Sequence, residues 1–136
     1  MALGLARSLQ YCGDNTPRAI VTDLKGFDWE RYFDYVLPVE RPLEEVFFGK
    51  MDLLDRTEAD EVLWVDSDCL AFRPLAEVFD YCKGKDFAIP GFSVNSGEFY
   101  GEVAPILRKQ QIESIPKVTA GLIYYERTAR ARAPAT

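Results

Sequence analysis

The chain has 136 residues, of which 48% are hydrophobic and 28% are charged, a balance typical of one globular domain rather than two. The net charge of −6 argues against nucleic acid as a partner, because a protein that binds nucleic acid needs a basic surface. The absence of histidine excludes His-based zinc sites, Ser-His-Asp triads and histidine general bases. Any metal or acid–base chemistry must therefore use Asp, Glu, Lys, Tyr or Cys.

The three cysteines, Cys12, Cys69 and Cys82, form an odd and unclustered set that predicts buried, reduced thiols rather than a disulfide framework. A reducing compartment is therefore expected, and with it a cytoplasmic location. No apolar stretch approaches the length of a membrane span. Residues 1–12 also lack the basic start and the long apolar core of a signal peptide.

Periodicity and turn residues predict an alternation of helices and strands along the chain. The expected helices cover residues 3–12, 28–32, 43–56, 75–81 and 102–111, and the expected strands cover residues 19–22, 35–37, 60–65, 86–89 and 120–125. Residues 91–100 are rich in Gly, Ser and Asn and are expected to form a loop.

This alternation predicts an α/β fold with a mostly parallel, Rossmann-like sheet and helices on both of its faces. Residues 1–126 are expected to form one domain, and residues 127–136, in which Arg and Ala alternate, are expected to form a disordered tail. The chain begins with a helix, and the apolar face of that helix is expected to pack against a strand that precedes it. A first strand is therefore expected to be missing.

The most informative stretch is the run of four apolar residues, Val62 to Val65, that leads into Asp66, Ser67 and Asp68. A continuous apolar run predicts a buried strand of a parallel sheet, and ligands of open α/β sheets bind beyond the carboxyl ends of the strands. Residues i and i+2 point the same way on an extended backbone. The carboxylates of Asp66 and Asp68 are thus predicted to share one Mg²⁺ or Mn²⁺ ion, which prefers oxygen ligands and bridges to substrate phosphates.

An alternative without a ligand stays open for this motif. An Asp-x-Asp at the end of a strand also occurs in a plain turn or at the N-cap of the following helix. The apolar strand before the motif, and the Phe-Arg-Pro-Leu sequence of residues 72–75 after it, favour the metal site.

Several segments of the chain together resemble the nucleotide-diphospho-sugar glycosyltransferases of the GT-A fold. They are Leu3-Gly-Leu-Ala-Arg-Ser-Leu9, Lys50-Met-Asp-Leu-Leu54, Asp60-Glu-Val-Leu-Trp-Val-Asp-Ser-Asp68, Phe72-Arg-Pro-Leu75 and Thr119-Ala-Gly-Leu-Ile123. Family eight, which includes glycogenin and the lipopolysaccharide galactosyltransferases, is the most similar group. The resemblance spans nearly all of residues 2–126.

The resemblance implies a UDP-sugar or a similar nucleotide-sugar as donor, with Mn²⁺ or Mg²⁺ on Asp66 and Asp68, and transfer of the sugar to an unknown acceptor with retention of configuration. The expected donor-binding residues are Lys50, Asp66, Ser67, Asp68, Thr119, Ala120 and Gly121, and no catalytic nucleophile or base is identified. Lys50 would contact the donor, with a solvated helix lysine as the alternative. The family has Asn at the position of Thr119.

The family's first strand would precede residue 1, and its histidine metal ligand would follow the last strand, so a fragment that is incomplete at both ends is expected. One alternative is a truncated or catalytically dead remnant that serves as a structural or interaction module. Another is a phosphohydrolase of the haloacid-dehalogenase type, whose Asp-x-Asp also ends a strand. That group has Thr or Val four residues after its first Asp, where this chain has Leu70.

Overall fold

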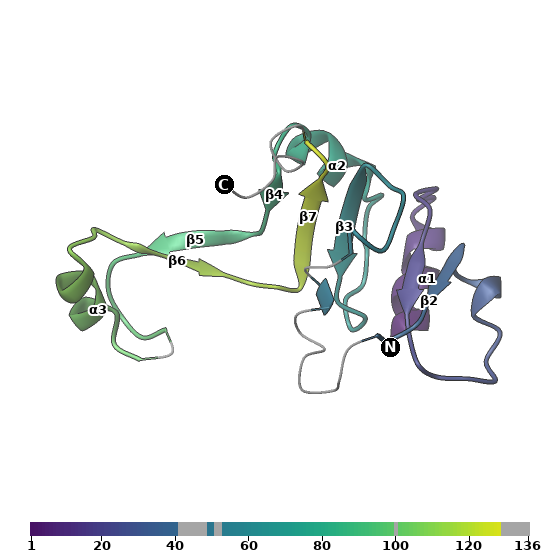
Figure 1. The fold of residues 1–136 in the computed structure, drawn as a ribbon, viewed down its shortest axis with the longest axis horizontal. Coiled ribbons are helices and arrows are strands. Elements are labelled where there is room, and N and C mark those ends of the chain that lie inside the picture. The colour runs from purple at the N-terminus through teal and green to yellow at the C-terminus, as the bar shows by residue number, and fades with distance from the viewer. Residues whose placement is uncertain (41–48, 51–52, 100, 129–136) are drawn as a thin grey trace.

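The computed structural model describes residues 1–40, 49–50, 53–99 and 101–128 and shows a mixture of helices and strands (Figure 1). The helices are α1 (Ala2–Tyr11), the 3₁₀ turn η1 (Trp29–Arg31), α2 (Ala76–Cys82) and α3 (Val103–Gln110). The strands are β1 (Ala19–Val21), β2 (Tyr35–Leu37), β3 (Glu61–Val65), β4 (Phe87–Ala88), β5 (Gly91–Val94), β6 (Ile115–Val118) and β7 (Leu122–Glu126). This composition is compatible with an α/β fold.

The described strands form three small sheets, with the orders β1-β2, β3-β7-β4 and β5-β6. Only the first of these is parallel, with Ala19 opposite Tyr35. The expected parallel pairing is wrong for the strand that carries the aspartates, because β7 runs antiparallel to both β3 and β4. The Rossmann-like sheet that the sequence predicts is therefore not present as one continuous sheet in the described residues.

The antiparallel direction of β7 follows from a long hairpin that covers most of the second half of the chain. Strands β5 and β6 leave the β3-β7-β4 sheet together as a projecting ribbon that carries α3 at its far end (Figure 1). The two ends of the ribbon meet at its base, because Thr119 N–H donates to Pro90 O at 3.0 Å. The chain thus returns beside β4 and runs antiparallel to it, whereas a parallel return needs a crossover connection of a dozen or more residues.

Two strands of the ribbon differ from the sequence-based expectation. Residues 91–94, expected in a loop, form β5, and β6 was not expected at all. Gly91 is needed at the first position of β5, because a Cβ there would lie 2.6 Å from Lys117 O on the paired strand. Most side chains of the ribbon are exposed, so it has little of the buried apolar pattern that identifies a strand.

The burial expected for β3 is also only partly met. All five of its residues are half-buried rather than buried. The physical reason is that β3 lies at the edge of its sheet, whereas a central strand is covered on both edges. The expected helix over residues 43–56 lies largely outside the described residues, and in its described part residues 49–50 form a 3₁₀ turn and residues 53–56 form turns.

Helix α1 confirms the amphipathic helix expected at the start of the chain. Ala6 and Leu9 are its buried residues. Gly13 follows the C-cap residue Cys12, and its φ of 72° suits a glycine that terminates a helix. One hydrophobic cluster joins α1 to β1 and to the segment before β2 through Ala6, Ile20 and Phe33. A second cluster forms on β7 and consists of Leu53, Ile123 and Tyr125.

The three cysteines are unpaired thiols, of which Cys82 is buried while Cys12 and Cys69 are half-buried. The expectation that all three would be buried is thus met by Cys82 alone. Residues 129–136 of the expected tail lie outside the described residues. Arg127, at the start of that tail, is held by hydrogen bonds from its guanidinium to Ala59 O and Thr57 O. In the described part of the chain, no helix has the length and apolarity needed to cross a membrane.

Asp14 links the end of α1 to the segment that leads into α2. Its carboxylate is buried and accepts hydrogen bonds from Thr16 N–H at 2.9 Å and from Leu75 N–H at 2.5 Å. The second bond spans 61 residues of sequence. It therefore fixes the chain after the Asp-x-Asp motif against the first helix.

We expect Asp14→Ala to lower the free energy of unfolding by about 2 kcal/mol, since two backbone N–H groups lose a charged acceptor. Urea denaturation followed by circular dichroism measures this loss. Asp23→Ala is the matched control, because Asp23 is exposed and should change the stability by less than about 0.5 kcal/mol. Equal effects of the two substitutions would show that the buried carboxylate does not link these segments.

Candidate functional site

The site forms where β3 ends, and three segments that lie far apart in the sequence meet there. Asp66 directly follows β3, and its N–H donates to Gly121 O at 2.9 Å. This bond extends the pairing of β3 with β7 by one residue and places the turn of residues 119–121 beside the first aspartate. The structure thus brings together the Asp-x-Asp motif, this turn and Lys50.

Lys50 lies inside this junction rather than in solvent. Only 8% of the residue is exposed, so the alternative of a solvated helix lysine is wrong. Its ammonium donates to Asp66 Oδ1 at 2.6 Å and to Ala120 O at 3.2 Å, and it lies 5.2 Å from the centre of the Trp64 ring. A buried ammonium is costly unless it is paired, and the carboxylate, the carbonyl and the indole together supply that pairing.

Asp66 receives a second hydrogen bond from the indole of Trp64. The distance from Trp64 Nε1 to Asp66 Oδ1 is 2.6 Å, so one carboxylate oxygen accepts both the ammonium and the indole N–H. Partial burial of the carboxyl opposes its ionisation, but the hydrogen bonds from Lys50 and Trp64 and the charge of Lys50 outweigh it and hold the pKa of Asp66 below its ordinary value. Asp66 is therefore a carboxylate at neutral pH.

Ser67 and Asp68 follow in an exposed turn. Cys69 N–H closes this turn by donating to Asp66 O at 3.0 Å, so the turn alternative describes the backbone here correctly. The helix-cap alternative does not hold, because α2 begins ten residues after Asp66 and has Leu75 at its N-cap position. Among the described residues, none donates to the Asp68 carboxylate, and this oxygen pair remains accessible to a ligand.

The donor set fits a cation that shares its ligands with a substrate. The described residues contain no group of three His, Cys, Asp or Glu side chains that would enclose a metal ion. The described residues offer the two carboxylates of Asp66 and Asp68. Gly121 lies next to Asp66 Oδ2 and, because it has no side chain, does not cover this oxygen. Mg²⁺ is commonly held by one or two carboxylates, with phosphates and water as its other ligands, and Asp66 and Asp68 are the residues that would supply these carboxylates.

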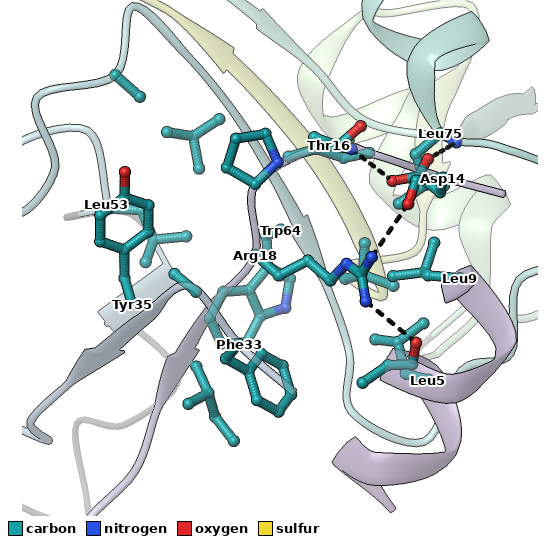
Figure 2. Close-up of a pocket in the computed structure, with 18 of the residues that line it drawn as sticks. Leu5, Leu9, Asp14, Thr16, Arg18, Phe33, Tyr35, Leu53, Trp64 and Leu75 are labelled. Atoms are coloured by element: carbon teal, nitrogen blue, oxygen red, sulfur yellow. Dashed lines mark hydrogen bonds between the residues drawn. The ribbon is translucent and has the colours of Figure 1, made fainter. Parts of the chain in front are cut away.

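An open cavity of about 1580 Å³ adjoins the site. Lys50 and residues 66–68 line it, together with residues from α1, β1 and β3. Figure 2 shows Arg18 reaching across the cavity, and its guanidinium donates to Ala6 O in α1 and to Asp14 O in the segment that follows the helix. The Asp-x-Asp motif therefore borders a space large enough for a nucleotide-sized ligand.

The sequence pattern and the family resemblance indicate every polar residue of the junction except Trp64. Its role has a signal in the sequence, because Trp64 stands two residues before Asp66 and side chains at i and i+2 of a strand lie on the same face. Arg18 was also missed, and nothing in its local sequence distinguishes it from a surface arginine. No protein-family model, no curated protein and no solved structure matches this chain.

The lowered pKa of Asp66 predicts a specific dependence of stability on pH. A carboxyl group whose pKa falls on folding stabilises the protein above its unfolded pKa, and this contribution is lost as the pH falls through the folded value. We therefore expect Asp66→Asn to destabilise the protein at pH 7 and to have a smaller effect at pH 3, which lies below the ordinary pKa of an aspartate, so that part of this contribution is already lost there.

Urea unfolding at both pH values, with EDTA present, measures this difference. Asp68→Asn is the matched control, because the exposed Asp68 carboxylate has no donor among the described residues, and this substitution should change stability little at either pH. A loss for Asp66→Asn of equal size at pH 7 and pH 3 would contradict an ionised Asp66 paired with Lys50.

Proposed function

We propose that the chain belongs to an enzyme that transfers a sugar from a nucleotide-diphosphate donor, with a divalent cation on its Asp-x-Asp motif. The observation that carries the proposal is the convergence at the end of β3. Lys50, Asp66 and Ala120 are far apart in the sequence, yet the ammonium of Lys50 contacts the other two directly. These are the segments whose sequences resemble family-eight glycosyltransferases, and their meeting supports one shared role.

The chemistry of donor binding follows from the charges of the site. A nucleotide diphosphate is anionic, and a chain with a net charge of −6 would repel it unless a cation lay between them. When bound, Mn²⁺ or Mg²⁺ would bridge the diphosphate to Asp66 and Asp68 and stabilise the charge that develops on the leaving group. Ser67 and the turn of residues 119–121 would adjoin the bound donor.

The contacts of Lys50 refine its proposed role. Its ammonium already pairs with Asp66 Oδ1, so Lys50 compensates part of the charge of Asp66 and leaves Asp68 as the carboxylate whose charge is fully available. The resemblance to family eight also implies that Asp68 is the stronger metal ligand, and we infer that Lys50 mainly positions Asp66. A positive charge held beside the diphosphate would still help to stabilise the departing nucleotide.

Mn²⁺-dependent binding of UDP is the decisive measurement for this proposal. Trp64 donates to Asp66, so its fluorescence should change when the carboxylate takes up a ligand. In a Trp29→Phe background Trp64 is the sole tryptophan, and the signal then comes from the site alone. We expect saturable quenching by UDP with Mn²⁺ present and at least about tenfold weaker binding after Asp68→Asn, since loss of a charged ligand costs more than 1.4 kcal/mol.

Glu113→Gln, in the exposed segment between α3 and β6 and outside the residues that line the cavity, is the control and should bind UDP as tightly as its background. If the folded chain shows no Mn²⁺-dependent binding of UDP, the donor site is absent and the chain acts as a structural or interaction module. Hydrolysis of p-nitrophenyl phosphate that is lost after Asp66→Asn would instead support a phosphohydrolase.

A further inference from the structure

The β5–β6 ribbon is a sheet of only two strands in the described part of the chain. Strand β5 pairs with β6 and with no other described strand, and Figure 1 shows the two strands projecting together from the β3-β7-β4 sheet. A two-stranded ribbon is marginally stable in water, and a sheet that is stable by itself needs three or more strands. The ribbon therefore gains stability when a further strand pairs with it.

The hydrogen bond at the base of the ribbon fixes the pattern of its ladder. Gly91 lies opposite Val118 in the register of β5 with β6, so the preceding residue Pro90 lies opposite Thr119. Thr119 N–H donates to Pro90 O. Pro90 and Thr119 are therefore a hydrogen-bonded pair, and bonded and non-bonded pairs alternate from this point along an antiparallel ladder.

This alternation assigns a direction to each residue of β5. Phe92 and Val94, at even steps from Pro90, belong to pairs that bond to β6. Gly91 and Ser93 belong to the non-bonded pairs and direct their N–H and C=O groups away from β6. Among the described residues, no backbone hydrogen bond outside the ladder reaches Gly91 or Ser93. The outer edge of β5 thus presents the N–H and C=O groups of both residues to a further strand.

The composition of β5 favours a second copy of this chain as the source of that strand. The residues of β5 are Gly, Phe, Ser and Val, so the edge carries no charge, and each of these residues has an N–H group. A chain with a net charge of −6 repels its own copies over much of its surface. An uncharged edge is a place where two copies approach each other without this penalty, whereas a charged partner finds no opposite charge on it.

The outward groups of β5 also match those of a second β5. When two copies run antiparallel about a twofold axis at Phe92, Gly91 of one copy lies opposite Ser93 of the other, and the symmetry repeats this pair. A hydrogen-bonded pair in an antiparallel ladder exchanges two N–H···O=C bonds. The two pairs together therefore satisfy all the outward N–H and C=O groups of Gly91 and Ser93 in both copies.

Phe92 would occupy the centre of this arrangement. It is 65% exposed, and on the axis it lies opposite its own copy in a non-bonded pair, where the side chains are closest. Aromatic cross-strand pairs stabilise sheets. Lys117 lies opposite Phe92 on the same face of the ribbon, but the two Lys117 residues would be three strand spacings apart, about 14 Å. That distance exceeds the Debye length of about 8 Å at physiological salt, so their repulsion is weak.

We propose that the outer edge of β5 is a self-association surface. Two copies of the chain pair through it, antiparallel about a twofold axis at Phe92, and form a four-stranded sheet of order β6-β5-β5-β6. Gly91 and Ser93 supply the hydrogen bonds between the copies, and Phe92 supplies the central side-chain contact. Because such a contact is small, the dimer is expected to be weak, with a Kd between about 10 µM and 1 mM.

Sedimentation equilibrium between about 10 µM and 1 mM protein measures the Kd of this dimer. Ser93→Pro removes one outward N–H from each copy and leaves the ladder with β6 intact, because Ser93 belongs to a non-bonded pair. The strand conformation of Phe92 is compatible with a proline after it. We expect Ser93→Pro to raise the Kd by at least about tenfold, because the twofold symmetry makes each substitution count twice.

Val118→Pro is the matched control. Val118 also belongs to a non-bonded pair of the same ribbon, so this substitution removes an outward N–H from β6 instead of β5 and should leave the Kd unchanged. Circular dichroism checks that both variants are folded. A wild-type chain that stays monomeric up to 1 mM overturns the proposal, and so does a Kd that Ser93→Pro leaves unchanged or that both prolines raise equally.

Amide hydrogen exchange in the wild-type chain, followed by NMR, tests the same edge without a substitution. Exchange at Gly91 and Ser93 should slow by about twofold or more between 50 µM and 1 mM protein, as mass action fills the dimer. Exchange at Phe92 and Val94, whose N–H groups bond to β6, should be independent of concentration. If the Ser93 amide is protected to the same degree at every concentration, the edge is covered within one chain and the proposal is overturned.

Discussion

The ion pair between Lys50 and Asp66 is the interaction on which the organisation of the site depends. Its two members come from different segments, and the ammonium also binds Ala120 O, so a single buried charge joins three parts of the chain. A buried ion pair contributes little net stability, but loss of one partner leaves the other charge uncompensated. The geometry at the end of β3 is therefore strongly specified even though the pair itself is energetically modest.

Elements with a strong local pattern could be predicted from the sequence, as α1, β2 and β3 show. The direction of β7 could not, because it depends on where the β5–β6 ribbon leaves the sheet and returns to it. The ribbon itself was missed, since its exposed residues lack the periodicity of buried apolar side chains that identifies a strand. Local sequence thus predicts the elements close to the hydrophobic clusters, but it does not predict the strands of the projecting β5–β6 ribbon.

The candidate site shows the same division between local and distant information. Asp66 and Asp68 stand out because an apolar strand precedes them, and the place of Lys50 was expected from resemblance alone. The reason that Lys50 is buried could not be derived locally, because its partners Asp66 and Ala120 lie 16 and 70 residues away. The open cavity was not expected either, although the apolar face of the first helix indicated a missing neighbour.

The projecting ribbon has a consequence for the behaviour of the chain in concentrated solution. A two-stranded ribbon presents two outer edges, and such edges pair readily with those of other molecules and start aggregation. Strand β6 carries Pro116, which has no N–H group to donate, and next to it Lys117, whose charge opposes close stacking. These two residues make the outer edge of β6 a poor template, so pairing between molecules through that edge of the ribbon is disfavoured.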